Sequence, residues 1–175
     1  MKNRYLVGWL LFFLPFLPLL AAHAQTNDNT YETPERLFYI GKSANRNIVC
    51  YDVNAKNGQL DTENPIKVYW VNREEHPGRT NGLSYFQRKM AYGYDVVSKG
   101  NNTCRCTLTA YPHRQLTIMK HRSKYTCLIN INHQAAILKS LYVKSKPHNP
   151  LSVEYVVLEG IDLKTHKVVK ETIKK

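Results

Sequence analysis

The sequence predicts an all-β fold, namely an antiparallel β-sandwich, with a closed β-barrel as the alternative. Short runs rich in β-branched and aromatic residues recur along the chain, with turn-forming residues between them at intervals of roughly ten residues. Only one stretch, near residues 83–92, spaces its apolar residues as a helix does. The choice between the two architectures bears on function, because a barrel encloses a ligand cavity and a sandwich need not.

The first 24 residues are predicted to be an export signal that is cleaved from the chain. Lys2 and Arg4 give a basic start, residues 5–20 are apolar, and residues 22–24 (Ala-His-Ala) form a small-x-small cleavage site. Two prolines interrupt the apolar run, which disfavours a permanent membrane helix. We therefore expect an exported protein, periplasmic or secreted, with no transmembrane segment once the signal is removed.

The rest of the chain is predicted to be one domain with a short leader. Residues 25–34 are polar and without periodicity, which is typical of a flexible segment, and residues 35–175 form a single β-rich domain. The formal net charge is +12, and removal of residues 1–24 leaves +10. A basic surface attracts an anionic glycan or a lipid head group, and an envelope protein is a further possible partner. Nucleic acid is not expected, because arginine and aromatic residues do not interleave.

The first strands are expected on either side of a strong hairpin signal. Residues 37–40 are a short apolar run, and residues 48–53 alternate between two faces. Asn57-Gly58 is the strongest two-residue turn signal in the chain. Residues 66–71 are β-branched and aromatic, and a proline stands at their start, where a missing N–H is tolerated.

The remaining strands are expected as a meander followed by longer strands. They are residues 104–111, 115–120, 125–132, 137–144 and 153–158, and a closing hairpin over 161–169. Residues 112–114 and 122–124 supply the turns of the meander, and residues 146–150 form a loop.

The exception to the strand pattern is a short predicted helix. Its apolar positions, i, i+3, i+7 and i+8, are Leu83, Phe86, Met90 and Ala91. Ser84 and Gln87 stand at capping-box spacing, and Gly93 is placed to end the helix. We expect this helix to pack over a mouth or an edge of the sheets.

The cysteines predict disulfide bonds. There are four, an even number that is typical of an exported chain, and they are Cys50, Cys104, Cys106 and Cys127. Cys104 and Cys106 lie two apart on one strand, where a Cα separation of roughly 6.5 Å makes a mutual bridge the least favoured. We expect at least one bridge from Cys104 or Cys106 to Cys50 or Cys127. The alternative is a soft-metal site on the two neighbouring thiols. No metal site and no cofactor are predicted.

Candidate catalytic residues lie in one loop. Glu74, Glu75 and His76 follow a predicted strand, and a carboxylate that orients an imidazole supports acid–base chemistry. As neighbours in sequence, their side chains diverge unless the loop folds back, and a solvated turn is the simpler interpretation.

Candidate ligand-binding residues are two arginines and two aromatic residues. Arg46 and Arg73 form a bidentate anion site if they sit at one end of adjacent strands. Trp70 and Tyr92 offer faces on which a sugar or an apolar group stacks. The alternatives are ion pairing of the arginines with acids and ordinary packing of the aromatic rings.

Three segments carry a family resemblance. Residues 45–54 (NRNIVCYDVN), 64–70 (NPIKVYW) and 83–94, which end in Ala-Tyr-Gly-Tyr, resemble domain-of-unknown-function family 4833. The resemblance covers nearly all of the chain after the signal. It implies a short secreted protein of a mainly Gram-negative group with a periplasmic or surface location. It implies no activity and therefore no catalytic residue.

The sequence thus leaves three functional hypotheses. The first is a non-enzymatic exported β-rich module that binds a ligand or a cell-envelope component. The second is a hydrolase of envelope glycans or lipids that uses Glu74 or Glu75 with His76. The third is a structural partner of another envelope protein that presents a sheet edge or an apolar patch.

Overall fold

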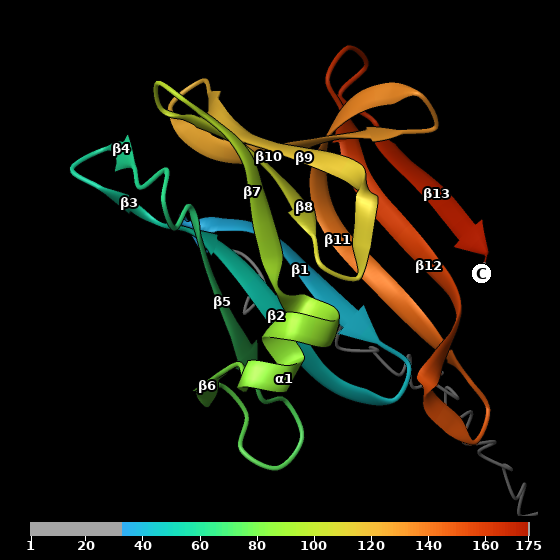
Figure 1. The fold of residues 1–175 in the computed structure, drawn as a ribbon. Helices are drawn as coiled ribbons and strands as arrows, with labels where there is room; N and C mark the ends of the chain where they lie inside the picture. The colour runs from blue at the N-terminus through green and yellow to red at the C-terminus, as the bar shows by residue number, and fades with distance from the viewer. Residues whose placement is uncertain (1–32, 175) are drawn as a thin grey trace, which may run out of the picture.

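A computed structural model describes residues 33–174, which form a curled β-sheet with one short helical segment (Figure 1). The elements are β1 (Arg36–Lys42), β2 (Asn45–Val53), β3 (Ala55–Lys56), β4 (Gln59–Leu60), β5 (Ile66–Val71), β6 (Thr80–Gly82), α1 (Tyr85–Gln87), η2 (Arg88–Tyr92), β7 (Tyr94–Gly100), β8 (Thr103–Leu108), β9 (Tyr111–His121), β10 (Lys124–Ile131), β11 (Gln134–Lys146), β12 (Asn149–Asp162) and β13 (Val168–Lys174). The predicted signal, residues 1–24, and most of the predicted leader lie outside the described residues.

The all-β prediction is confirmed, and the strands form one continuous sheet. Its order is β6-β5-β2-β1-β11-β10-β9-β8-β7, while β12 and β13 branch from β11. The sheet curls into a half-barrel, so the two layers expected of a sandwich are parts of one hydrogen-bonded sheet (Figure 1). Within residues 33–174, no strand ladder joins β5 or β6 to β7, and a closed barrel is therefore not formed.

One pairing departs from the antiparallel expectation. β1 runs parallel to β11, with Tyr39 opposite Ser140 and Lys42 opposite Val143, and the other pairings are antiparallel. The parallel pair joins segments about one hundred residues apart in sequence, and it connects the N-terminal strands to the C-terminal meander. No local turn signal marks such a pair, because only tertiary packing brings the two strands together.

The main core lies on the inner face of the curl. Phe38 of β1 stacks on Tyr51 of β2 with ring centroids 4.3 Å apart, and both side chains are fully buried. Leu116, Ile118 and Leu138 face them from the C-terminal half of the sheet. The period-two alternation of each strand sends every second side chain into this core, which accounts for the strands seen in the sequence.

The turns confirm the strongest hairpin signal. Asn57 and Gly58 have positive φ angles of 50° and 76° between β3 and β4, as a tight two-residue turn requires. Asn132 and His133, with φ angles of 49° and 64°, make a second such turn between β10 and β11. This turn contains no glycine, and positive φ angles are uncommon in other residues, so the sequence offered little warning of it.

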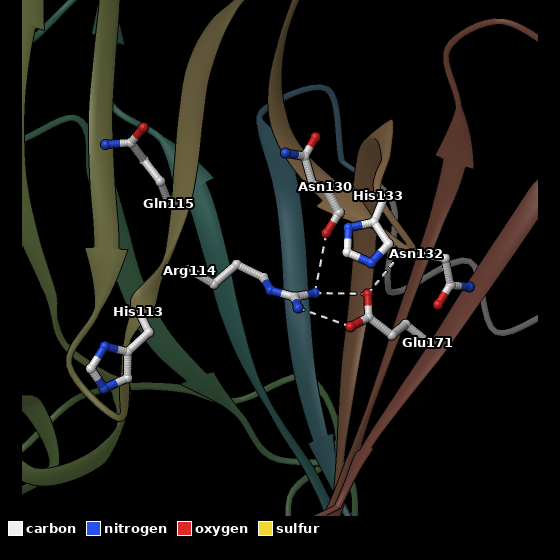
Figure 2. A pocket seen from close by; sticks show the side chains of 7 residues that line it. All are labelled: His113, Arg114, Gln115, Asn130, Asn132, His133 and Glu171. Carbon is white, nitrogen blue, oxygen red and sulfur yellow. Dashed lines mark hydrogen bonds and ion pairs between the residues drawn. The ribbon is translucent and has the colours of Figure 1, made fainter.

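The last strand is fastened to the meander by an ion pair. The Arg114 guanidinium of β9 donates to both carboxylate oxygens of Glu171 in β13, each at 2.8 Å (Figure 2). The Asn132 backbone N–H also donates to this carboxylate, at 2.8 Å. The hydrogen bonds from Arg114 hold the pKa of Glu171 below its usual value. The bidentate pair therefore links two elements that share no backbone ladder.

The predicted helix is present, but only part of its apolar face is buried, with Leu83 in the core. Ser84 caps α1, and Gln87 completes the capping box, as predicted. The chain then widens into one π-helical turn, η2, which ends at Gly93. Phe86 and Met90 are each 75% exposed, whereas the spacing predicted that they would pack on the sheet. Among the described residues, no helix is long and apolar enough to cross a bilayer.

Candidate functional site

The open edge of the half-barrel, here called the seam, is the place where residues 66–68 of β5 face residues 94–96 of β7. β6 pairs with β5 only at residues 69–71, so the first half of β5 has no further strand beside it among the described residues. Tyr94 crosses the gap. Its hydroxyl accepts a hydrogen bond from the Ile66 N–H at 3.3 Å and donates to the Ile66 carbonyl at 3.0 Å. At the seam, the Tyr94 hydroxyl thus satisfies the backbone groups that a neighbouring strand would satisfy elsewhere in the sheet.

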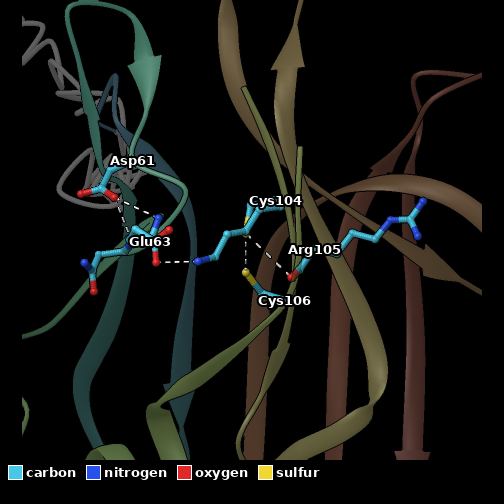
Figure 3. Close-up of polar contacts among 7 residues, drawn as sticks. Asp61, Glu63, Cys104, Arg105 and Cys106 are labelled. Atoms are coloured by element: carbon cyan, nitrogen blue, oxygen red, sulfur yellow. Dashed lines mark hydrogen bonds and ion pairs between the residues drawn. The ribbon is translucent and has the colours of Figure 1, made fainter. Parts of the chain in front are cut away.

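Above Tyr94 the seam is held by further polar contacts. Lys99 of β7 pairs with Glu63, which precedes β5. The Leu60 N–H donates to the Asn102 side chain at 3.1 Å, which ties the β3–β4 hairpin to the turn after β7. Figure 3 shows the ion pair at Glu63, and Lys99 stands opposite Cys104 of β8 in the β7–β8 ladder. The seam is therefore closed at its upper end by side chains.

Below these contacts the seam opens into a pocket of about 470 Å³, here called the seam pocket. Its apolar walls are Val68, Leu83 and Val96. The other lining residues are Glu63, Asn64, Arg88, Lys89, Gly93, Tyr94, Asp95 and Thr109. A cavity with apolar walls and polar groups at its rim has the composition of a small-ligand site, and its size falls within the usual range.

The rim of the seam pocket carries two available cations. Arg88 uses its Nε to donate to the Leu83 carbonyl at 3.4 Å, and within residues 33–174 neither Arg88 nor Lys89 forms an ion pair. The two acids of the rim are Glu63 and Asp95. Because Lys99 neutralises Glu63 from outside the pocket, the balance at the rim is positive. An anionic group is therefore the complement of this rim.

Two of the predicted ligand-binding residues do come together, beside a lysine that the sequence reasoning missed. Trp70 and Tyr92 meet edge to face, with ring centroids 5.1 Å apart. Lys42 places its Nζ 4.4 Å from the Trp70 ring centroid, and burial lowers the pKa of this amine. We call these three residues the Lys42 cluster. A pattern in the sequence could have pointed to Lys42, because Phe38, Ile40 and Lys42 follow one another at period two along the strand.

The Lys42 cluster also holds an unused hydrogen-bond donor. The Trp70 Nε1 is buried and has no hydrogen-bond partner among residues 33–174. The cluster borders the seam pocket along the chain, because Trp70 lies two residues after Val68 and Tyr92 precedes Gly93. The Tyr51 hydroxyl fixes the end of η2 in place by donating to the Tyr92 carbonyl at 2.8 Å.

Each of the two predicted arginines uses its backbone N–H to contact a residue next to the other arginine. The Arg46 N–H donates to the Glu74 carboxylate at 3.0 Å, and the Arg73 N–H donates to the Asn47 side chain at 2.8 Å. The start of β2 and the loop after β5 are thus adjacent, as the prediction required. Neither arginine lines the seam pocket.

The candidate catalytic loop is exposed. Glu74, Glu75 and His76 all lie at the surface. Glu74 is engaged by the Arg46 backbone, and the His76 carbonyl accepts a bond from the Arg79 N–H at 3.1 Å. Within residues 33–174, the His76 imidazole has no hydrogen bond or ion pair with either carboxylate. The loop does not assemble the acid–base pair that the hydrolase hypothesis needs.

The predicted disulfide is wrong: Cys50, Cys104, Cys106 and Cys127 are all free and buried. Cys50 packs with Ile48 and Val71 on the outer face of β2, whereas the other three cysteines belong to the inner core. Cys104 and Cys127 are both opposite Ile118, so the whole of β9 lies between them. Two strand spacings, roughly 10 Å, exceed the reach of a disulfide.

The nearest pair of sulfur atoms is the one that the sequence disfavoured. The Cys104 and Cys106 Sγ atoms are 3.5 Å apart on the inner face of β8, while Arg105 points away from them (Figure 3). Burial raises the pKa of Cys50 to about 11 and also raises the pKa of Cys106 and Cys127. In the described part of the chain, no three His, Cys, Asp or Glu side chains gather as a metal site requires.

A second pocket, of about 360 Å³, lies beside the Arg114–Glu171 pair (Figure 2). Its walls are polar, and the residues that line it are His113, Arg114, Gln115, Asn130, Asn132, His133 and Glu171. Since Arg114 is already neutralised by Glu171, this pocket lacks the available cation that the seam pocket has.

Comparison with known proteins gives one match. A family model described as a domain of unknown function, DUF4833, matches residues 38–172. No curated protein and no solved structure matches the chain. The matched range includes the seam, the Lys42 cluster and the Arg114–Glu171 pair.

Proposed function

This chain belongs to the DUF4833 family, whose description assigns no activity, and we propose that it is an exported, non-enzymatic module that binds an anionic cell-envelope ligand in the seam pocket. The observation that carries the proposal is the pairing of apolar walls with two unpaired cations in one cavity. Val68, Leu83 and Val96 suit a carbon skeleton, and Arg88 and Lys89 suit phosphate or carboxylate oxygens.

Binding rather than catalysis is favoured by the chemistry of the rim. A hydrolytic site needs a general acid or base in contact with a nucleophile or a polarised bond. Neither carboxylate of the seam pocket is placed as a general acid or base. Glu63 pairs with Lys99, and Asp95 is exposed to solvent. Cys104 and Cys106 are buried on the inner face of β8, and burial raises the pKa of the Cys106 thiol.

Export remains a proposal that rests on the sequence alone. Residues 1–24 have the three regions of a cleavable signal. An anionic glycan and a lipid head group are the two sources of phosphate or carboxylate that an exported protein meets at a cell envelope. Both present the same anionic oxygens to Arg88 and Lys89, so the two sources must be separated by experiment.

The test uses protein isolated after export, with its N-terminus established by intact mass. Isothermal titration calorimetry would use sn-glycerol 3-phosphate as the head-group probe, hexagalacturonate as the glycan probe and neutral maltohexaose as the control. We expect one anionic probe to bind and maltohexaose not to bind. Replacing both rim cations, Arg88→Gln with Lys89→Gln, should weaken binding at least about 10-fold, because two charge-assisted contacts are lost.

A matched control is available on a strand that does not line the seam pocket. Lys139 and Lys146 are exposed residues of β11, so Lys139→Gln with Lys146→Gln removes the same charge without touching the seam pocket. If neither anionic probe binds at millimolar concentration, or if both double variants lose binding equally, the seam pocket is not an anion site and the proposal is overturned.

A further inference from the structure

The helical segment presents an apolar surface to solvent. Tyr85 is 70% exposed, and Phe86 and Met90 are each 75% exposed. The Tyr85 and Phe86 rings contact each other edge to face at 5.8 Å, and Phe86 and Met90 are four residues apart on successive turns. We call these three side chains the cap face. Neither α1 nor η2 contains a buried residue, so the segment does not owe its position to these side chains.

The cap face is held rigidly by contacts elsewhere on the same segment. The capping box of Ser84 and Gln87 fixes its start. The Gly93 N–H closes the last turn by donating to the Arg88 carbonyl at 3.0 Å, and the Tyr51 hydroxyl secures the Tyr92 carbonyl. The chain therefore forms an ordered turn whose large apolar residues point outward, although burying them would have stabilised the fold.

The size of the cap face sets the kind of partner that it can engage. Aromatic side chains bury roughly 150–250 Å² each, so the two rings and the methionine at these exposures offer about 400 Å². A stable protein interface needs about 800 Å² from each partner. A lipid surface sets no such threshold, because each apolar side chain inserts independently and adds to the binding.

The charge around the cap face indicates which lipid surface suits it. Arg88 and Lys89 lie between Phe86 and Met90 in the same segment, and within residues 33–174 neither of them forms an ion pair. The formal charge is +12 for the whole chain and +10 once residues 1–24 are removed. Aromatic residues beside Arg and Lys are typical of segments that lie in a membrane interface and favour anionic head groups.

We infer that the cap face inserts into the surface of an anionic lipid bilayer and docks the protein there, with the seam pocket beside the membrane. The pocket shares Arg88 and Lys89 with this segment, so docking brings the proposed ligand site to the level of the head groups. Docking itself needs only the cap face and the basic charge. It therefore holds whether or not the seam pocket takes a ligand.

The experiment is flotation of the exported protein, freed of residues 1–24, with unilamellar vesicles. One set is phosphatidylcholine alone and the other is an equal mixture of phosphatidylcholine and phosphatidylglycerol. We expect binding to the anionic vesicles only, weaker in high salt. Phe86→Ser with Met90→Ser should reduce the partition coefficient at least about 10-fold, because two apolar anchors are removed.

Val168 provides a matched control, since it is 57% exposed on β13. Val168→Ser should bind vesicles as the unmodified protein does. A Phe86→Trp variant adds a direct measurement, because its emission should shift to the blue when the ring enters the bilayer. Equal binding by the unmodified protein and the Phe86/Met90 variant would overturn the inference. So would a dimer in vesicle-free buffer that becomes a monomer in that variant, which would assign the cap face to a second copy of the chain.

A seam-pocket variant separates this inference from the proposed function. Val96→Phe fills the pocket without touching the cap face. It should abolish binding of the soluble anionic probe and leave vesicle flotation unchanged. The Val96→Phe protein could instead lose flotation while it stays folded with its cap face intact. That result would show that the pocket, and not the cap face, anchors the protein to the membrane, and the inference would be wrong.

Discussion

The Tyr94 hydroxyl satisfies both backbone groups of Ile66, accepting from its N–H at 3.3 Å and donating to its carbonyl at 3.0 Å. The two residues lie on the two unpaired edges of the curled sheet. One phenol thus takes the place of a strand partner at the point where a closed barrel would have continued its ladder. The seam pocket lies directly beside this contact, because Tyr94 is one of the residues that line it.

Replacement of Tyr94 by Phe should destabilise the fold by about 1–2 kcal/mol, since a buried N–H and a carbonyl lose their partner. The effect should also be local. Amide hydrogen exchange at Ile66 and Val68 should quicken more than exchange in β9 or β10. Urea denaturation gives the first quantity and exchange monitored by NMR gives the second.

Tyr85→Phe is the control for that substitution, because Tyr85 is 70% exposed and lies outside the seam. It should change stability by less than about 0.5 kcal/mol. If the two variants are equally stable, then Tyr94 does not hold the seam.

The pair formed by Arg114 and Glu171 predicts a specific dependence of stability on pH. The pKa of Glu171 lies below its ordinary value of 4.5, because Arg114 donates to its carboxylate. A depressed pKa in the folded state contributes stability above the ordinary value, and this contribution is lost as pH falls through the folded pKa. Glu171→Gln should therefore cost about 1–2 kcal/mol at pH 7 and progressively less below pH 4.5.

Urea denaturation of both proteins from pH 7 down to pH 3 measures this difference. Glu159→Gln is a suitable control, because its partner Lys170 is 61% exposed and a surface pair contributes little. A stability difference for Glu171→Gln that stays constant across the whole range would show that the carboxylate charge is not what fastens β13.

Substitution of Gly93 by Ala should disrupt the end of η2. A Cβ atom at this position would lie 2.1 Å from the Arg88 carbonyl oxygen and 3.0 Å from the Thr109 Oγ1. Because the Arg88 carbonyl is part of the backbone and cannot shift without strain, we expect the free energy of unfolding to fall by about 2 kcal/mol. The environment of Trp70 should change as well, because Tyr92 contacts its ring at 5.1 Å.

Gly82→Ala is the matched control, since a Cβ there meets no atom within 4 Å. Denaturation followed by Trp70 fluorescence reports on both variants. A Gly93→Ala protein as stable as the unmodified protein, with unchanged emission, would contradict the geometry at this position.

The cysteines should behave as buried thiols. Cys50, Cys104, Cys106 and Cys127 are at most 1% exposed, and the pKa of Cys50 is raised to about 11. A thiol in this state is a poor nucleophile at pH 8. Ellman's reagent should react slowly with the native protein and should find four thiols after denaturation in guanidinium without reductant. Two thiols instead of four would reveal a bridge that the structure does not contain.

Local patterns were sufficient for much of the secondary structure. The Asn57-Gly58 turn, the capping box of Ser84 and Gln87, and the strand over residues 66–71 were all predicted from nearby residues. These features depend on backbone preferences and hydrogen bonds within a few positions, which the sequence displays directly. The same reasoning overestimated the burial of Phe86, because helical spacing shows which residues share a face and not what covers it.

The candidate site could be predicted only in part. Trp70 and Tyr92 were paired from their residue types alone, but Lys42 and the rim cation Lys89 were missed. A basic residue on a helical surface is ordinarily solvated, and its place beside a pocket depends on where the helix is docked. The disulfide prediction failed for a similar reason. An even count of cysteines does not reveal that Cys50 is buried on the outer face of the sheet, away from the other three cysteines.

By itself the sequence determined that this chain is β-rich, where its strands turn, and that one short capped helix interrupts them. Tertiary structure alone decided that β1 runs parallel to β11, that Arg114 reaches Glu171, and that Tyr94 bridges an open seam. Each of these contacts joins residues at least 28 positions apart. Such contacts depend on how far the whole sheet curls, which is a property of the packed core and not of any single segment.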